Sequence, residues 1–337
     1  MKRAVQMLVL LCVLALVVIM VGCSGGNGAP DGATVDTARK PPAPPPPPPP
    51  GEKIAYVAGL NAAQTIYTMA ADGSGKTALR AGSDPAWSPD GSKIAYAAPV
   101  TAPDGSTVRC IAIMDAAGTV ITQLTSPTVL PDEPGYATDG DPDRSPDGQY
   151  VVFTRGRPSS GVIQWIYLVP VAGGDPTELV YVDTAGDTKD PRLYLPTWRP
   201  GGNEIVYWFY GQVNGVYVNE LRMLTVDNGV PSASTLLLAA AGHPAWSNDG
   251  SRLAFRIGSE LGLFTAGFAN GALDMENKVK VTAGNHSQPT WDPTGQNIAY
   301  FGVGAQAPYC DVFTVPAGGG TATNLTSTRR ADEHSPD

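Results

Sequence analysis

The chain has 337 residues, of which 16% are charged and 42% are hydrophobic, so it carries enough apolar side chains for a packed core. Its 31 acidic residues outnumber its 22 basic ones, and no cluster of Lys and Arg offsets them, which argues against a role in nucleic-acid binding. Glycine (39 residues) and proline (32 residues) are abundant. With little helical periodicity, this composition is typical of many short strands joined by turns.

The N-terminus has the features of a secretory signal. Lys2 and Arg3 precede fourteen uninterrupted apolar residues, Leu8 to Val21, a run shorter than a membrane-spanning helix of about 20 residues. The following Met20-Val21-Gly22-Cys23 resembles the bacterial lipobox, in which the cysteine is acylated after cleavage just before it. The sequence therefore predicts lipidation of Cys23, with an ordinary secretory signal or an N-terminal membrane anchor as the alternative.

A lipidated cysteine would anchor the mature chain in a lipid bilayer, because two or three acyl chains hold a protein stably on a membrane. Ser24 follows the cysteine, whereas an aspartate there would suggest retention in the inner membrane. We therefore expect a lipoprotein of the bacterial cell envelope, attached to the outer membrane and facing the periplasm. Removal of the signal peptide, residues 1–22, takes away two basic residues and leaves a net charge of −11.

Residues 23–50 are predicted to form a disordered tether. Residues 24–40 are rich in Gly, Ala, Asp and Thr and show no apolar periodicity. Seven consecutive prolines, Pro44 to Pro50, end the segment, and with Pro41-Pro42-Ala43 they make a polyproline II spacer of roughly 30 Å at about 3.1 Å per residue. A site for a proline-recognising module is the alternative to a spacer.

A repeated element fills residues 51–337. It is clearest in Asp84-Pro85-Ala86-Trp87-Ser88-Pro89-Asp90-Gly91, which is followed by the triplet Ile94-Ala95-Tyr96. Related copies centre on Arg144, Trp198, Trp246 and Trp291, and an apolar–small–aromatic triplet begins seven residues after each centre. The Pro and Gly residues favour a tight turn. The triplet then alternates as a strand, with its first and third side chains expected on one buried face.

Two further strands follow each triplet, so each copy is predicted to form a four-stranded antiparallel sheet. Successive centres lie 57, 54, 48 and 45 residues apart, the spacing of propeller blades. The final His334-Ser335-Pro336-Asp337 can be read on into Gly51, which places His334 at the tryptophan position and Ile54-Ala55-Tyr56 seven residues later. The sequence therefore predicts an all-β, six-bladed β-propeller that is closed by pairing of its N- and C-terminal segments in one blade, and a complete chain.

The element Pro-x-Trp-Ser-Pro-Asp-Gly-x-x-Ile-Ala-Tyr resembles the repeat of the TolB-like propellers, also called PD40 or WD40-like repeats. The resemblance covers residues 51–337 and implies the propeller fold. TolB carries a mixed α/β domain before its propeller, whereas this chain has an anchor and a spacer in that place. The resemblance therefore leaves a role in the Tol–Pal system open, and a fold alone does not name a function.

The connectors that lead into the inner strands are expected to ring one mouth of the central channel. The candidate binding rim is acidic and carries histidines, and it consists of Asp84, Asp141, Asp190, His243, His286 and Asp332. Such a rim favours a basic or metal-bridged partner. The repeated tryptophans are expected to pack between blades and not to bind a ligand.

Two patterns suggest a metal. Asp139-Gly-Asp141-Pro-Asp143 begins like a calcium loop, but Arg144 stands where an EF-hand loop needs glycine, so a solvated acidic loop is favoured. His243, His286 and His334 fall at or next to the starts of inner strands in three consecutive blades and could ligate a transition metal. Propeller lyases of the oligogalacturonate lyase type, which resemble this chain in fold, hold a metal with histidines at the channel mouth.

The sequence favours a non-catalytic, membrane-anchored, monomeric propeller that binds an envelope protein, peptide or glycan without a cofactor. The alternative is a metal-dependent, lyase-like enzyme that uses the three histidines, although an acidic rim would repel an acidic sugar. The chain has no room for the separate hydrolase domain of prolyl peptidases. Cys110 and Cys310 fall in non-neighbouring blades, so we expect no disulfide between them.

Overall fold

The structure is a computed structural model that describes residues 53–59, 64–130, 135–157, 163–182, 188–227, 229–303, 310–327 and 333–337. The predicted signal peptide, the lipidated Cys23 and the tether lie outside the described residues, as does Asp332. Within the described ranges, no helix has the length and apolar character needed to cross a membrane. The regular secondary structure there consists of β-strands.

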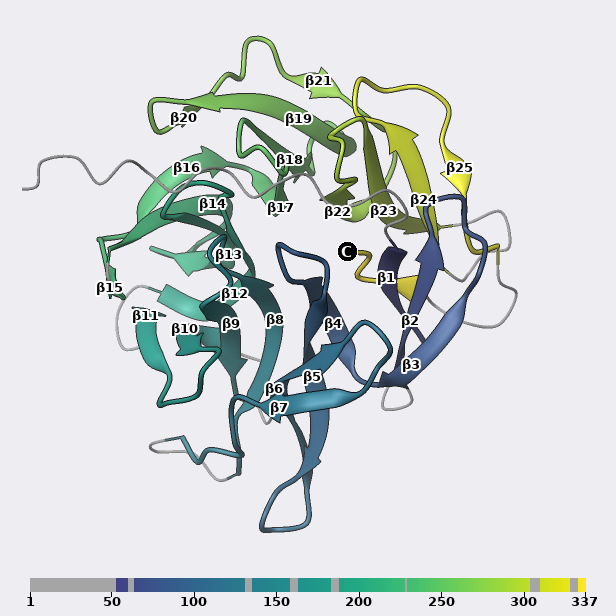
Figure 1. The fold of residues 1–337 in the computed structure, drawn as a ribbon. Helices are drawn as coiled ribbons and strands as arrows, with labels where there is room; N and C mark the ends of the chain where they lie inside the picture. Colours follow the sequence, from purple (N-terminus) through teal and green to yellow (C-terminus); the bar gives the residue numbers. More distant parts are fainter. Residues whose placement is uncertain are drawn as a thin grey trace, which may run out of the picture. The chain divides into compact units, whose positions relative to one another are not determined.

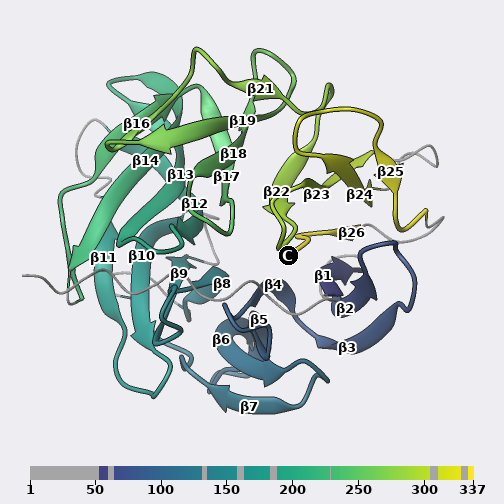
Figure 2. The same cartoon turned by 45° about the horizontal axis from the view of Figure 1, so that its top comes forward.

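The strands form six antiparallel blades around a common centre, which confirms the predicted fold class (Figures 1 and 2). From the innermost strand outward, blade 1 consists of β4 (Ser83–Trp87), β5 (Lys93–Thr101), β6 (Thr107–Asp115) and β7 (Val120–Gln123). Blade 2 consists of β8 (Thr138–Arg144), β9 (Tyr150–Gly156), β10 (Ile163–Pro170) and β11 (Thr177–Tyr181). Blade 3 consists of β12 (Thr188–Trp198), β13 (Glu204–Val213), β14 (Val216–Asp227) and β16 (Thr235–Ala239), and β15 (Val230–Pro231) pairs with the end of β14.

The remaining blades follow the same order. Blade 4 consists of β17 (Ala241–Trp246), β18 (Arg252–Ile257), β19 (Gly262–Ala269) and β21 (Val279–Lys280), and β20 (Ala272–Leu273) extends β19. Blade 5 consists of β22 (Ser287–Trp291), β23 (Asn297–Val303), β24 (Cys310–Pro316) and β25 (Thr323–Asn324). Blade 6 is built from both ends of the propeller, with β26 (Glu333–His334) innermost, then β1 (Lys53–Ala58), β2 (Thr65–Ala70) and β3 (Thr77–Ala81).

The triplets explain why the blades stack. The first and third residues of a triplet pack on one neighbouring blade, and the small middle residue packs on the other. In blade 1, Ile94 and Tyr96 share a core cluster with Val57 of blade 6, and Ala95 shares one with Phe153 of blade 2. The prediction of one buried face was too narrow, because both faces of the second strand are buried. A small middle residue leaves room for the aromatic ring of the next blade.

The Ser-Pro-Asp-Gly turns form as the sequence predicts. The Ser88 hydroxyl donates a hydrogen bond to Asp90 at 2.5 Å, the backbone N–H of Gly91 donates to the carbonyl of Ser88 at 2.8 Å, and Gly91 has a φ of 65°. A positive φ is the conformation that glycine adopts at least cost. This turn fixes how far each inner strand is offset from the triplet strand.

The predicted packing role of the tryptophans is confirmed. Trp198, Trp246 and Trp291 are buried and Trp87 is half-buried. The indole N–H of Trp291 donates to the carbonyl of Ala245 in blade 4 at 3.0 Å, so the ring also ties two blades together. No disulfide joins Cys110 to Cys310, in line with the sequence.

The two ends of the chain meet in blade 6, which confirms the predicted closure. β26 pairs antiparallel with β1, with His334 opposite Val57. Asp337 and Ala55 exchange both backbone hydrogen bonds, at 2.7 and 2.8 Å. The C-terminus therefore lies at the centre of the ring, next to the inner strands (Figure 1).

The predicted register of this closure is wrong by four residues. In blade 1, Ala86 lies opposite Ala95, and Ala95 is the counterpart of Ala55, so Asp337 takes the place of Ala86. His334 consequently takes the place of Ser83, four positions away from the tryptophan position. The reason is that the repeat contains two prolines, one in the strand and one in the turn. Because the chain is interrupted here and no turn has to be closed, Pro336 takes the place of the strand proline.

Candidate binding channel

The innermost segment of every blade contains the same kink. The residue before the strand proline has a positive φ of 47° to 53°, and the pairing with the next strand slips at this point. These six residues line the channel and are Asp84, Asp141, Leu195, His243, Gln288 and Ser335. Residues other than glycine rarely adopt a positive φ, and such conformations gather at functional sites because the surrounding structure must hold them in place. The repeat thus fixes six backbone positions at the channel and varies the side chain at each.

A cavity of about 280 Å³, here called the mouth cavity, lies at one level of the channel. Blades 1 and 2 contribute the carboxylates of Asp84 and Asp141. Blades 3 and 4 contribute an aromatic wall of Tyr194, Trp208 and His243, in which the ring centroids are 4.9 Å apart between Tyr194 and Trp208 and 4.4 Å apart between Trp208 and His243. The cavity therefore combines acceptors of hydrogen bonds with flat ring surfaces.

The protonation of the mouth cavity follows from burial. Burial, and then the charge of Asp84, raise the pKa of Asp141 to about 7, although the backbone N–H of Leu195 at 3.4 Å and the guanidinium of Arg109 act in the opposite direction. Burial, and then the positive charge of Arg256, lower the pKa of His243 to about 3. At neutral pH, His243 is therefore an uncharged ring, while Asp141 is poised between its two protonation states.

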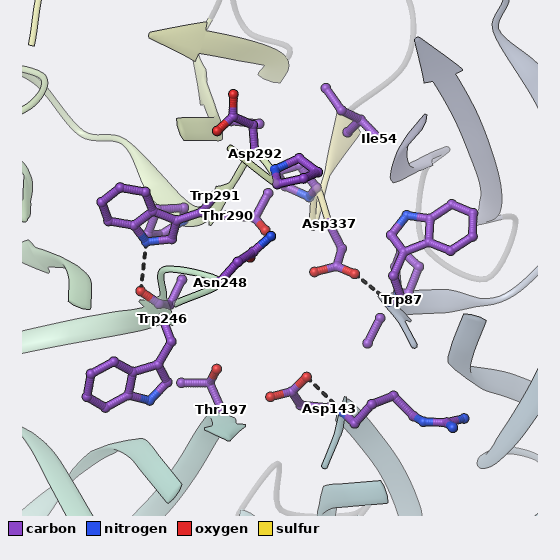
Figure 3. A pocket seen from close by; sticks show the side chains of 18 of the residues that line it. Ile54, Trp87, Asp143, Thr197, Trp246, Asn248, Thr290, Trp291, Asp292 and Asp337 are labelled. Carbon is purple, nitrogen blue, oxygen red and sulfur yellow. Dashed lines mark hydrogen bonds between the residues drawn. The ribbon is translucent and has the colours of Figure 1, made fainter. Parts of the chain in front are cut away.

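A second cavity of about 900 Å³, here called the channel cavity, lies along the next inward-facing positions of the inner strands. Figure 3 shows Asp143, Thr197, Thr290 and Asp337 around it. Each carboxylate accepts a hydrogen bond from the next blade: Asp143 from the backbone N–H of Trp198 at 2.7 Å, and Asp337 from that of Trp87. These contacts link blade 2 to blade 3 and blade 6 to blade 1.

Two of the carboxyl groups that line the channel cavity, those of Asp143 and Asp337, are weaker acids than usual. Burial raises the pKa of Asp143 to about 6, and the hydrogen bonds from the backbone of Trp198 and Arg144 limit the rise. Burial also raises the pKa of Asp337 to about 7, with a further contribution from the charge of Asp143. Near neutral pH the channel therefore holds both charged and protonated carboxyl groups.

The structure brings together only part of the predicted rim. Asp84, Asp141 and His243 line the mouth cavity. Asp190 is exposed near the start of β12 and lines neither cavity. His286 packs on Tyr300 with ring centroids 4.7 Å apart and also lines neither cavity.

The predicted metal ligands do not converge. Among the described residues, no group of three His, Cys, Asp or Glu side chains is placed to hold a metal ion. The ring of His243 contacts Trp208 at an interplanar angle of 38°, the Nδ1 of His286 lies 2.9 Å from the hydroxyl of Thr282, and the Nε2 of His334 lies 2.9 Å from the amide of Gln64. Each histidine thus makes local contacts within its own part of the ring.

The prediction of a solvated acidic loop at Asp139-Gly-Asp141-Pro-Asp143 is wrong, because this segment is the inner strand β8. Asp139 is 2% exposed and forms an ion pair with Arg155, whose Nε lies 2.7 Å and Nη2 2.9 Å from its carboxylate oxygens. Asp143 accepts the hydrogen bond from the backbone N–H of Trp198 in blade 3. The three carboxylates therefore have three different environments and do not form a calcium loop.

The sequence reasoning missed several lining residues. Leu195, Gln288 and Ser335 could have been found, because each precedes a proline at the position that Asp84 occupies in its copy. Trp208 and Tyr194 carry no such signal. They reach the mouth cavity because β12 and β13 of blade 3 are long, at 11 and 10 residues, and pair beyond the repeated element.

Comparison with known proteins gives the fold. No family model and no curated protein matches the chain. Among solved structures, a candidate TolB from Agrobacterium tumefaciens is 16% identical with a TM-score of 0.53, over 82% of this chain and 89% of that one. Hydrazine synthase of Kuenenia stuttgartiensis has a TM-score of 0.60 at 11% identity, over 86% of this chain and 46% of that one. A chain of a nidogen–laminin complex has a TM-score of 0.54 at 10% identity, over 83% of this chain and 96% of that one.

These likenesses confirm a TolB-like propeller fold. At identities of 10% to 16% they show the fold alone. The set includes an enzyme and a protein from a binding complex, so the activity of this chain has to be argued from its own channel.

Proposed function

We propose that this protein is a non-catalytic propeller of the bacterial cell envelope that binds a protein, peptide or glycan partner at the mouth of its channel. The observation that carries the proposal is the ring of six inner-strand residues held at positive φ around the channel, with two carboxylates beside an aromatic wall. A cavity that combines apolar ring surfaces with a few convergent polar groups is typical of a binding site.

The metal-dependent alternative is less well supported. It requires the three histidines to coordinate one metal ion, and each of them instead makes separate local contacts. In the part of the chain that the structure describes, no group of three His, Cys, Asp or Glu side chains is placed to hold a metal ion. Binding is therefore the function that the geometry favours.

The membrane attachment rests on the sequence. The lipobox-like Met20-Val21-Gly22-Cys23 and the prolines that end at Pro50 support a tethered propeller in the periplasm, attached to the outer membrane through acylated Cys23. Metabolic labelling with a radioactive fatty acid tests this part. The label should enter the wild-type protein and be absent from Cys23→Ala; equal labelling of the two would contradict the proposal.

In-cell photo-crosslinking tests the binding function. A photoreactive amino acid at Leu195 or Gln288 places the probe at the mouth cavity, and one at Ile121, an exposed residue of the outer strand β7, serves as the control. We expect a discrete crosslinked species from the two mouth positions and none from Ile121. Equal crosslinking from all three positions, or none from the mouth, would count against binding there.

A further inference from the structure

The mouth cavity has a charge that its own residues do not balance. Of its acidic residues, Asp139 is neutralised by Arg155. Asp84 and Asp141 remain, and Arg109 is the cation beside them. Arg109 is exposed, and its guanidinium bonds the hydroxyls of Ser83 and Thr138, each at 3.4 Å, not the two carboxylates. When both carboxylates are ionised, one positive charge supplied by a ligand would therefore neutralise the cavity.

The aromatic wall indicates the shape of that cation. Trp208 is fixed by a hydrogen bond from its indole N–H to the side-chain oxygen of Asn219 at 2.5 Å, and it lies between Tyr194 and His243 in a run of ring contacts. Aromatic faces attract cations, and a flat cation stacks on them more closely than a round one. The wall consequently suits a planar charged group.

His243 carries a buried polar atom in the wall of the mouth cavity. It is largely buried and lines the mouth cavity, and its Nδ1 has no hydrogen-bond partner among the described residues. Buried polar atoms in folded proteins are usually paired. The Nδ1 atom has almost no accessible surface, so an N–H donor in the cavity reaches it only after the imidazole ring turns.

We infer that the mouth cavity binds the guanidinium group of an arginine side chain that the partner carries. Asp84 and Asp141 accept its hydrogen bonds, and the rings of Tyr194, Trp208 and His243 flank it. A guanidinium supplies five N–H donors in one plane and pairs with carboxylates in a fork, which an ammonium group cannot do. A neutral sugar would stack on the same rings but would leave the negative charge unbalanced. The inference rests on the proposed function, since it names the group through which the partner engages the channel.

The experiment uses the full chain in detergent and the peptide acetyl-Ala-Arg-Ala-amide, with acetyl-Ala-citrulline-Ala-amide as its uncharged isostere. Isothermal titration calorimetry should show that the citrulline peptide binds at least about tenfold more weakly, because a charged hydrogen-bonding group is lost. Asp84→Asn combined with Asp141→Asn should weaken the arginine peptide to a similar extent. Asp190→Asn is the matched control, since it makes the same change at a rim position outside the cavity, and it should leave binding unchanged.

Arg109→Gln gives a test in the opposite direction. It removes the competing cation from the mouth cavity, so the arginine peptide should bind several-fold more tightly. Equal binding of the arginine and citrulline peptides, or full binding by the double variant, would overturn the inference. Thermal unfolding of each variant identifies a loss of binding that comes from a loss of folding.

The same variants separate this inference from the proposed function. If the partner still crosslinks from Leu195 in the Asp84→Asn and Asp141→Asn background with undiminished yield, the partner binds at the mouth without an arginine, and only the inference fails. If the wild type gives no crosslink from the mouth while the arginine peptide binds, the proposed function fails and the cation site stands.

Discussion

Replacement of Arg155 by methionine should destabilise the propeller strongly. Arg155 is 5% exposed and Asp139 is 2% exposed, and two hydrogen bonds of 2.7 and 2.9 Å join them. The hydroxyl of Thr125 donates to the same carboxylate at 2.6 Å and accepts the backbone N–H of Ile111 at 2.8 Å. The pair therefore holds β8 and β9 of blade 2 against blade 1.

Arg155→Met keeps most of the side-chain volume beside Phe153 and Tyr167, whose ring centroids lie 5.4 and 4.9 Å from the guanidinium carbon. It leaves the carboxylate of Asp139 buried with one remaining hydrogen bond. Loss of one partner of a buried ion pair costs about 3–5 kcal/mol, and we expect a decrease of this size in the free energy of unfolding. Urea unfolding at 25 °C, followed by tryptophan fluorescence, measures it.

Two further variants test the reasoning. Lys278→Met breaks the more exposed pair with Glu260, whose charged atoms are 3.4 Å apart, and should cost less than about 1 kcal/mol. Asp139→Asn, added to Arg155→Met, removes the uncompensated charge and should recover about 2 kcal/mol. If Arg155→Met costs no more than Lys278→Met, or if the second substitution recovers nothing, the unpaired buried charge is not the cause.

Three other predictions follow from the channel and the closure. Deletion of residues 333–337 removes both backbone hydrogen bonds between Asp337 and Ala55 and exposes the edge of β1, so the truncated protein should aggregate and unfold at lower urea than Asp337→Asn, which keeps this pairing. The pKa of Asp143 is about 6 in the folded protein against an ordinary 3.8, so the native state binds more protons than the unfolded state between pH 4 and 6. Stability should fall by about 3 kcal/mol as the pH rises through this window, and Asp143→Asn should flatten that part of the urea-midpoint profile. Burial raises the pKa of the Cys110 thiol to about 11, so it should resist alkylation at pH 8 in native protein and react in urea; rapid native labelling of Cys110 in a Cys310→Ser background would contradict this.

The sequence predicted the fold because the repeat encodes packing. The triplet strands and the turn glycines are local features, and in all five copies the triplet begins seven residues after the centre. The register of blade 6 could not be predicted in the same way. A single Pro336 can stand for the strand proline or the turn proline, and only the pairing of Asp337 with Ala55 decides between them.

The candidate site was predicted less well, because position near an inner strand does not determine which way a side chain points. Asp190 and Asp141 both precede a proline and both have a positive φ, yet Asp190 is exposed and lines neither cavity, whereas Asp141 is half-buried and lines both. The difference arises because β12 is longer than the inner strands of the other blades, so that Leu195, five residues after Asp190, takes the channel position. The greater length of β12 thus changes which residue of blade 3 faces the channel.

The asymmetry of the channel follows from how a repeat is constrained. Positions that pack between blades must fit both neighbours, which keeps the triplets alike in all six blades. The residue before the strand proline lines the channel and is not packed between two blade faces, so its side chain varies: it is Asp in two blades and Leu, His, Gln or Ser in the others. The two Asp residues fall in adjacent blades, where their charges add, and the wall of rings comes from the next two blades. A scaffold of six similar blades therefore carries a mouth whose carboxylates lie on one side and whose aromatic rings lie on another. Because the mouth is asymmetric, a partner would be bound in a single orientation.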